Sequence, residues 1–70
     1  MKLIDLKIGC SGTVVRVPAA RLKEIGLVPG TRVTIVSKGL FGNPLEIAFA
    51  GNYLLIDRKT AEQTEVEPCG

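Results

Sequence analysis

Two cysteines, Cys10 and Cys69, carry most of the chemistry open to this 70-residue sequence, because the chain has no histidine. A disulfide between them is conceivable, but the thiols of a cytosolic chain are kept reduced. A metal site would need further ligands from Asp or Glu, since there is no C-x-x-C spacing and the cysteines stand at opposite ends of the sequence. We therefore expect two independent thiols, with no bound metal and no cofactor.

Acid–base catalysis has equally little support in the composition. Without histidine, proton transfer would fall to Glu or Lys side chains. A ligand pocket takes about 300 Å³ or more, and a domain with one small core has little interior to spare. The sequence therefore predicts a binding module without catalytic residues, and not an enzyme.

The charge pattern argues against nucleic acid as a partner. Nine Lys and Arg residues outnumber seven Asp and Glu residues, for a net charge of +2, and the two signs are interspersed. The densest basic cluster is only Arg58-Lys59, and no aromatic side chain accompanies it. Single-stranded RNA is usually bound on a basic surface with aromatic side chains for stacking. An RNA-binding barrel stays open as an alternative because small barrels do bind RNA.

The apolar runs of the sequence are short. None approaches the ~20 residues of a membrane-spanning helix, and the N-terminus lacks the apolar segment of a signal peptide. These two features predict a cytoplasmic protein.

A cassette near the middle of the chain predicts how the elements are joined. Leu22 and Ile25 lie three apart on one face of a helix predicted over residues 19–25, and this short helix needs a sheet to dock on. Gly26 can adopt the positive φ that ends a helix. Pro29-Gly30 suits the two central positions of a type II turn.

Runs rich in β-branched residues or with alternating apolar residues predict strands over residues 13–17, 31–37, 45–49 and 53–58. Residues 59–67 fit one helical turn and a short strand. We expect a single domain over residues 1–67, followed by a frayed tail over residues 68–70.

Two stretches carry large apolar side chains that need a covering. Leu40 and Phe41 lie in a predicted loop, where they would either plug an open end of the barrel or contact a partner. The strand over residues 53–58 is apolar on both faces. Tyr53 and Leu55 would therefore lie under a packed helix or form a docking surface.

The expected fold is mainly β: a small SH3-like barrel of about five short strands with one short helix after the first strand. An OB-fold is the nearest competitor. It carries its helix between the third and fourth strands, whereas here the helix follows the first.

The order of these elements resembles the FeoA family, the small cytosolic ferrous iron transport protein A, and also the SH3-like domains at the C-terminus of metal-dependent repressors. The resemblance covers residues 3–67. The residues that carry it are Leu6-x-x-Gly9-x-x-Gly12-x-Val14, Arg21-Leu22-x-x-Ile25-Gly26-Leu27-x-Pro29-Gly30-Thr31-x-Val33, Gly42-Asn43-Pro44-Leu45-Glu46-Ile47 and Gly51-x-x-Leu54-x-Ile56-x-Arg58-Lys59.

This resemblance implies a non-enzymatic accessory of ferrous iron uptake. Its partner would be the membrane transporter FeoB, whose cytoplasmic part binds and hydrolyses GTP, and docking there would bias the transporter's conformations. An SH3-like protein-interaction domain of a metal-dependent transcriptional repressor is the alternative. The candidate contact residues, chosen by position, are five apolar side chains and two basic residues at their rim: Leu22, Leu40, Phe41, Tyr53 and Leu55, with Arg21 and Lys23.

Asn43 replaces the usual acidic residue of the FeoA pattern, and the sequence departs from that pattern at three further places. Residues 17–21 form a shorter segment than is usual, the end after Lys59 is one residue short, and Thr64 stands where an apolar residue is common. These changes should shorten the helix and loosen the closure of the C-terminal end.

Overall fold

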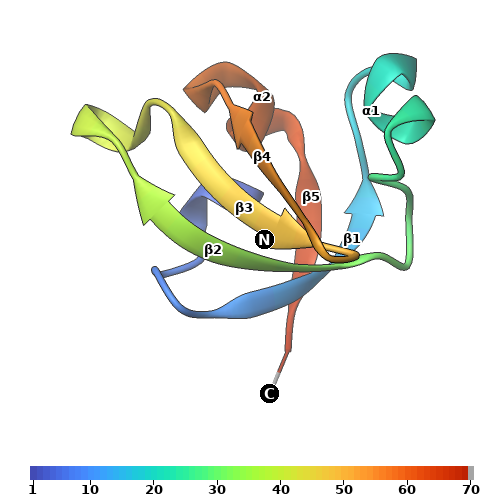
Figure 1. Ribbon diagram of the computed structural model, residues 1–70, viewed down its shortest axis with the longest axis horizontal. Helices are drawn as coiled ribbons and strands as arrows, with labels where there is room; N and C mark the ends of the chain where they lie inside the picture. Colours follow the sequence, from blue (N-terminus) through green and yellow to red (C-terminus); the bar gives the residue numbers. More distant parts are fainter. Residues whose placement is uncertain (70) are drawn as a thin grey trace.

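Five antiparallel strands form one strongly bent sheet in the order β4-β3-β2-β1-β5 in the computed structural model, which describes residues 1–69 (Figure 1). The strands are β1 (Ser11–Arg16), β2 (Arg32–Lys38), β3 (Leu45–Phe49), β4 (Asn52–Ile56) and β5 (Glu65–Pro68). The helical segments are α1 (Ala20–Glu24), α2 (Arg58–Gln63) and two 3-10 turns, η1 (Leu3–Asp5) and η2 (Leu40–Gly42). The mainly β fold with a short helix after the first strand is confirmed.

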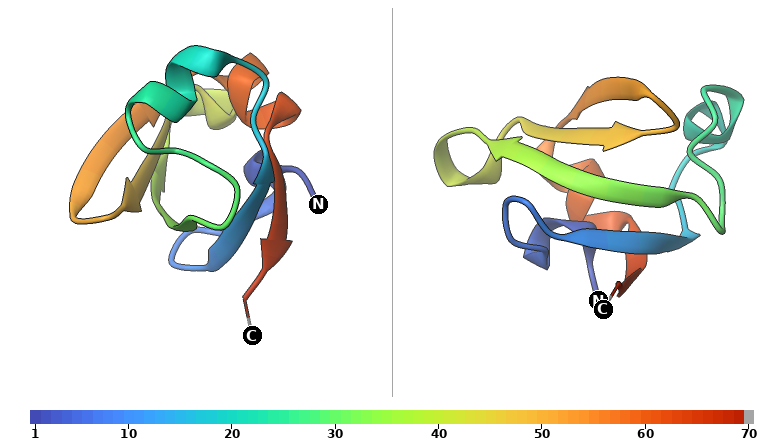
Figure 2. Two further views of the ribbon diagram at one scale, coloured as in Figure 1. Left: turned by 90° about the vertical axis from the view of Figure 1, so that its right-hand side faces the viewer. Right: turned by 60° about the horizontal axis from the view of Figure 1, so that its bottom comes forward.

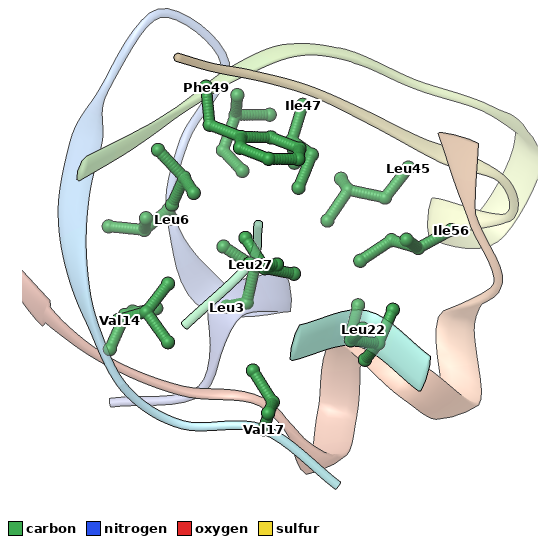
Figure 3. Close-up of a cluster of buried hydrophobic side chains, with 14 residues drawn as sticks. Leu3, Leu6, Val14, Val17, Leu22, Leu27, Leu45, Ile47, Phe49 and Ile56 are labelled. Carbon is green, nitrogen blue, oxygen red and sulfur yellow. The ribbon is translucent and has the colours of Figure 1, made fainter. Parts of the chain in front are cut away.

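The concave side of this sheet encloses one apolar core (Figure 3). Strand β3 shows why: Leu45, Ile47 and Phe49 alternate with less buried residues and all point inward. Leu3 and Leu27, which lie outside the strands, are completely buried at the centre of the cluster. Segments from both ends of the chain and from its middle therefore share one core.

Helix α1 ends where Gly26 takes φ +96°. The Gly26 N–H donates to the Lys23 carbonyl at 3.1 Å, and the Leu27 N–H donates to the Leu22 carbonyl at 2.9 Å. This pair of bonds is a Schellman motif, and the accompanying apolar contact joins Leu22 and Leu27 in the core. The predicted helix end is confirmed, although the helix is shorter than residues 19–25.

The turn after α1 also follows the prediction. The Thr31 N–H donates to the Val28 carbonyl at 3.0 Å, and Gly30 has φ +94°, as the second central position of a type II turn requires. The chain then enters β2, which pairs with both β1 and β3.

Strands β3 and β4 form a hairpin with a two-residue turn. Phe49 pairs with Asn52, and Ala50 and Gly51 between them have φ of +49° and +78°. Positive φ at both positions is the pattern of a type I′ turn, whose twist matches that of the flanking strands. The register then runs without a shift to the Leu45–Ile56 pair.

The N-terminal residues close the opposite end of the sheet along β5. The Val66 N–H donates to the Met1 carbonyl at 2.7 Å, and the Leu3 N–H donates to the Thr64 carbonyl at 2.8 Å. Thr64 is fully buried, and its hydroxyl donates to the Thr60 carbonyl at 2.8 Å. Contrary to expectation, Thr64 does not loosen the closure, because its polar atom is hydrogen bonded locally.

The end of the chain is also more ordered than the expected tail. Pro68 is the last residue of β5, and the Cys69 N–H donates to the Ser11 carbonyl at 2.9 Å. The expectation of fraying from residue 68 is therefore wrong for Pro68 and Cys69, and the remaining tail residue, Gly70, lies outside the described residues.

Candidate docking surface

An open hollow of about 370 Å³, here called the α1–β4 groove, separates helix α1 from strand β4. Figure 2 shows α1 standing apart from the sheet on this side of the molecule. The groove is lined by Arg21, Leu22, Glu24, Ile25, Leu54, Leu55, Ile56, Asp57 and Thr60. Apolar side chains therefore form its walls and floor, and charged or polar groups stand around them.

The floor of the groove contains Leu22, which is only 5 % exposed. It packs in the core together with Ile56 of β4 (Figure 3). The sequence-based choice of Leu22 as a contact residue therefore needs correction, because the side chain is largely engaged within the fold. Its docking on the sheet, also expected, is confirmed.

Ile25 is the residue that sequence reasoning missed. It was expected to dock on the sheet beside Leu22, but 49 % of it is exposed on the wall of the groove. The regular helix ends at Glu24, and Ile25 has φ −94° and ψ 6°. Ile25 is thus the C-cap residue and lies outside the regular helix, to which the three-residue spacing applies. A prediction that ended the helix at Glu24 would not have placed Ile25 on the same helical face as Leu22.

Strand β4 presents Tyr53 and Leu55 outward, with exposures of 70 % and 63 %. Ile56 is buried and Leu54 is partly buried on the opposite face. The interpretation that a packed helix covers Tyr53 and Leu55 is therefore wrong, and the alternative of an exposed apolar surface agrees with the structure. Leu55 also lines the α1–β4 groove.

Leu40 and Phe41 lie far from this groove. They sit in η2, which Figure 1 and the right-hand view of Figure 2 place at the opposite end of the molecule from α1. Phe41 has φ +56° and is 80 % exposed, and Leu40 is similarly exposed. The interpretation that these side chains plug the barrel is wrong, because the short η2 turn directs both away from the core.

Phe41 borders a second hollow, of about 660 Å³, between the N-terminus, η2 and α2. Its charged groups are largely engaged in pairs. The Lys38 Nζ donates to the Ile4 carbonyl at 2.8 Å, and the N-terminal ammonium lies 3.2 Å from the Glu65 carboxylate. These contacts tie the N-terminus to the sheet, so the second hollow is explained by its structural role.

The electrostatics of the α1–β4 groove are localised at the end where β4 meets α2. The hydroxyl of Thr60 donates to the Asp57 carboxylate, and this bond is the main reason why the pKa of Asp57 is lowered. The positive charge of Arg21 lowers the same pKa further. Arg21, Asp57 and Glu24 thus place charged groups on the lining of a groove whose remaining lining residues, apart from Thr60, are apolar.

The other rim residue expected from the sequence, Lys23, lies exposed on α1. The seven expected contact residues thus divide into groups. Arg21, Leu22 and Leu55 line the groove, Tyr53 and Lys23 stand next to it, and Leu40 and Phe41 are remote from it.

The two thiols are free and exposed. The Cys69 Sγ lies 3.5 Å from the Thr13 Oγ1. Within residues 1–69, no three His, Cys, Asp or Glu side chains gather in a group that could hold a metal ion. Among the helices of the same residues, none is long and apolar enough to cross a membrane.

This arrangement is suited to recognition. The groove combines apolar walls with the carboxylates of Asp57 and Glu24 and the guanidinium group of Arg21, which is the composition of a binding surface with a polar rim. Its titratable groups do not include a histidine.

Comparison with known proteins identifies the family. The family model described as the FeoA domain matches residues 1–68. A search among curated proteins found no match.

Solved structures agree with the family match. The solution structure of FeoA from Chlorobium tepidum is 32 % identical, with a TM-score of 0.92 over all of this chain and 71 % of that one. FeoA of Stenotrophomonas maltophilia, a prokaryotic SH3 domain protein solved with zinc, is 28 % identical, with a TM-score of 0.83 over 96 % of this chain and 89 % of that one.

The same fold occurs in a regulator. A manganese-dependent transcriptional repressor matches 99 % of this chain and 41 % of its own length, with a TM-score of 0.84 and 19 % identity. At this identity the likeness concerns the fold alone.

Proposed function

Because this chain belongs to the FeoA family of ferrous iron transport, we propose that it is a cytoplasmic, non-enzymatic accessory that docks on the GTP-binding cytoplasmic part of a FeoB-type transporter. The observation that carries the proposal is the α1–β4 groove, where Ile25 and Leu55 stay exposed beside a buried floor. Apolar surface left uncovered in this way is typical of a protein contact.

The proposed contact has a centre and a rim. Ile25, Leu55 and the neighbouring Tyr53 supply the apolar centre, and Arg21 and Lys23 supply positive charge beside it. Apolar and aromatic side chains that become fully desolvated carry most of the energy of a protein interface, while rim charges chiefly guide association.

The exposed pair Leu40 and Phe41 would form a second, separate contact. Its distance from α1 means that one small partner segment does not cover both regions. A large partner such as a transporter domain can reach both, so the two regions can be tested independently.

Regulation by docking requires a difference in affinity. The accessory shifts the transporter only if it binds one nucleotide-dependent conformation more tightly than another. A tenfold preference corresponds to about 1.4 kcal/mol, which a few interface contacts can supply.

A binding assay with the purified cytoplasmic part of FeoB tests this proposal. Leu55→Asp should weaken binding roughly 10- to 30-fold, because it places a charge in the apolar centre. Ile8→Asp is the matched control, since Ile8 is 59 % exposed, close to the value for Leu55, and lies outside the groove. Phe41→Asp measures the second contact.

Circular dichroism and thermal melting establish that each variant is folded. Equal affinity of the wild type, Leu55→Asp and Ile8→Asp for FeoB would show that the groove is not the contact. Absence of any binding by the wild-type protein would reject the partner itself.

A further inference from the structure

The free edge of β4 carries main-chain groups that face away from the sheet. In a two-residue hairpin the closing pair, here Phe49 and Asn52, is hydrogen bonded, and hydrogen-bonded pairs then alternate along the strands. Leu54 and Ile56 therefore bond to β3. The N–H and C=O groups of Tyr53 and Leu55 point the other way.

The neighbouring ladder is compatible with this alternation. Strand β3 lies between β4 and β2, and its residues 45–48 have register partners on both strands. Because hydrogen-bonded and non-hydrogen-bonded pairs alternate in an antiparallel ladder, the closing Phe49–Asn52 pair makes residues 45, 47 and 49 the ones that bond β4. Within residues 1–69, no hydrogen bond involves the main-chain N–H or C=O of Tyr53 or Leu55 outside the sheet ladder.

Edge strands usually carry a device that prevents pairing with another chain, such as a proline, an inward charge, a bulge or a covering segment. The other edge of this sheet has such a cover, because Met1 bonds to Val66 of β5 and Leu3 bonds to Thr64, just before that strand. Strand β4, with the sequence Asn-Tyr-Leu-Leu-Ile and no shift in its register, has none of the first three devices. The main-chain groups on the outer edge of β4 are therefore available to pair with a further strand.

Helix α1 lies beside this edge, so the edge forms one side of the α1–β4 groove and the helix forms the other. We call the space between them the slot. The α1–β4 groove has a volume of about 370 Å³. A helix about 10 Å wide would fill that volume within about one turn. An extended chain, which rises about 3.3 Å per residue, can run along several residues of β4 in the same space.

We propose that an extended apolar segment of the partner protein inserts between β4 and α1 and pairs with β4 as a sixth strand. The N–H and C=O groups of Tyr53 and Leu55 form its hydrogen bonds. This inference rests on the proposed docking function and defines how the docking occurs. Such strand addition is a recurring mode of peptide recognition.

The slot also defines the chemistry of the segment. Side chains that stand beside Leu54 enter the groove above Leu22 and meet Ile25, so they must be apolar. Side chains that stand beside Tyr53 and Leu55 lie on the outer face and extend that apolar surface. The segment is uncharged over these positions, because the residues it meets there are apolar, while the charges of Arg21, Glu24 and Asp57 lie elsewhere on the lining.

A second copy of this chain is a less suitable occupant. Its own β4 is flanked by its own α1, so two folded copies would bring two helices to one slot. An extended segment of another protein brings no such obstacle.

Amide hydrogen exchange measured by NMR tests the proposal, with the cytoplasmic part of FeoB as the probe. In the free protein, the amides of Leu54 and Ile56 should exchange slowly and those of Tyr53 and Leu55 rapidly. In the complex, the Tyr53 and Leu55 amides should slow by about tenfold or more, because a main-chain hydrogen bond now protects them.

The outcomes separate the two proposals. If FeoB binds but the Tyr53 and Leu55 amides keep their free exchange rates, docking stands and strand addition is rejected. If FeoB does not bind, the docking proposal fails and the inference built on it is overturned. Slowed exchange that depends on the concentration of the protein alone would identify a second copy as the occupant and would also reject the proposal.

Discussion

The two edges of the sheet differ: the N-terminal residues cover the β5 edge, whereas the β4 edge is uncovered. Along β5, Met1 and Leu3 donate or accept main-chain hydrogen bonds, and Leu3 is completely buried. Along β4, Tyr53 and Leu55 are exposed, and Leu55 lines the open α1–β4 groove. The main-chain groups of both residues face away from β3. The chain thus uses its own N-terminus to close one edge and leaves the other available.

This difference separates stability from recognition. Residues at the closed edge contribute apolar burial and satisfied hydrogen bonds to the fold. Residues at the open edge contribute little to the folded state and can change at small cost to stability. Substitutions at the two edges should therefore have different effects on stability and on binding.

The largest expected effect comes from breaking the closed edge. Leu3→Ala should lower the free energy of unfolding by about 2–5 kcal/mol, because it removes a fully buried side chain and leaves a cavity. Leu55→Ala, the matched change at the open edge, should alter it by no more than about 0.5 kcal/mol. Urea denaturation measures both. Equal losses would contradict the assignment of separate roles.

The wall of the open groove depends on the end of α1. Gly26→Ala should cost about 1–2 kcal/mol, because Gly26 has φ +96° and an L side chain is strained there. The added Cβ would meet only the Phe49 ring at 3.8 Å, so crowding is not the cause. Gly26→Asn should cost less, since asparagine tolerates this region better. Thermal unfolding measures the difference, and equal losses for both variants would point to a cause other than backbone conformation.

A smaller effect is expected from the polar bond that supports the closed edge. Thr64→Val keeps the shape of the side chain but removes the hydroxyl that donates to the Thr60 carbonyl. The loss should be about 0.5–1.5 kcal/mol. Urea denaturation tests this, and a gain in stability would show that the hydroxyl is not needed at this buried position.

The smallest effect concerns the charged end of the groove. The pKa of Asp57 is lowered from its ordinary 3.8, mainly by the Thr60 hydroxyl. This contribution to stability is present above pH 3.8 and is lost as the pH falls through the lower folded-state pKa. Thr60→Val should move the Asp57 pKa upward. Carboxyl NMR titration measures it, and an unchanged value would assign the shift to another group.

The sequence predicts local structure well where single residues determine it. Gly26 and Pro29-Gly30 specify their turns through backbone preferences, and the alternation over residues 45–49 specifies β3 completely. The order of these signals was also sufficient to indicate the family, which the match to residues 1–68 confirms.

The candidate site was harder to predict because exposure depends on tertiary contacts. Leu22 and Ile25 have similar apolar side chains, yet one is buried and the other lies on the groove wall. The helix was predicted to include Ile25, but it ends one residue earlier, at Glu24, and helix ends are difficult to predict to within one residue. Likewise, the strand pattern alone does not say that Leu55 faces outward while Ile56 faces the core, since both faces of β4 are apolar.

The cover of β5 had no clear signal in the sequence. Met1 and Leu3 lie far from residues 64–68 along the chain, and two of the hydrogen bonds between these segments, Val66 to Met1 and Leu3 to Thr64, form between main-chain groups. Main-chain pairing of this kind depends on topology more than on side-chain type. Only the folded structure therefore shows that the β5 edge is covered and the β4 edge is not.

The most direct test of the account compares the affinities of Leu55→Pro and Leu55→Ala for the cytoplasmic part of FeoB by isothermal titration calorimetry. Proline removes the outward N–H, which the ladder to β3 does not use, and edge strands tolerate proline at such positions. Both variants lose the leucine side chain, and thermal melting verifies that both remain folded. Strand addition predicts that Leu55→Pro binds at least about tenfold more weakly than Leu55→Ala, because the partner's carbonyl loses its donor. Equal affinities of the two folded variants would contradict the account.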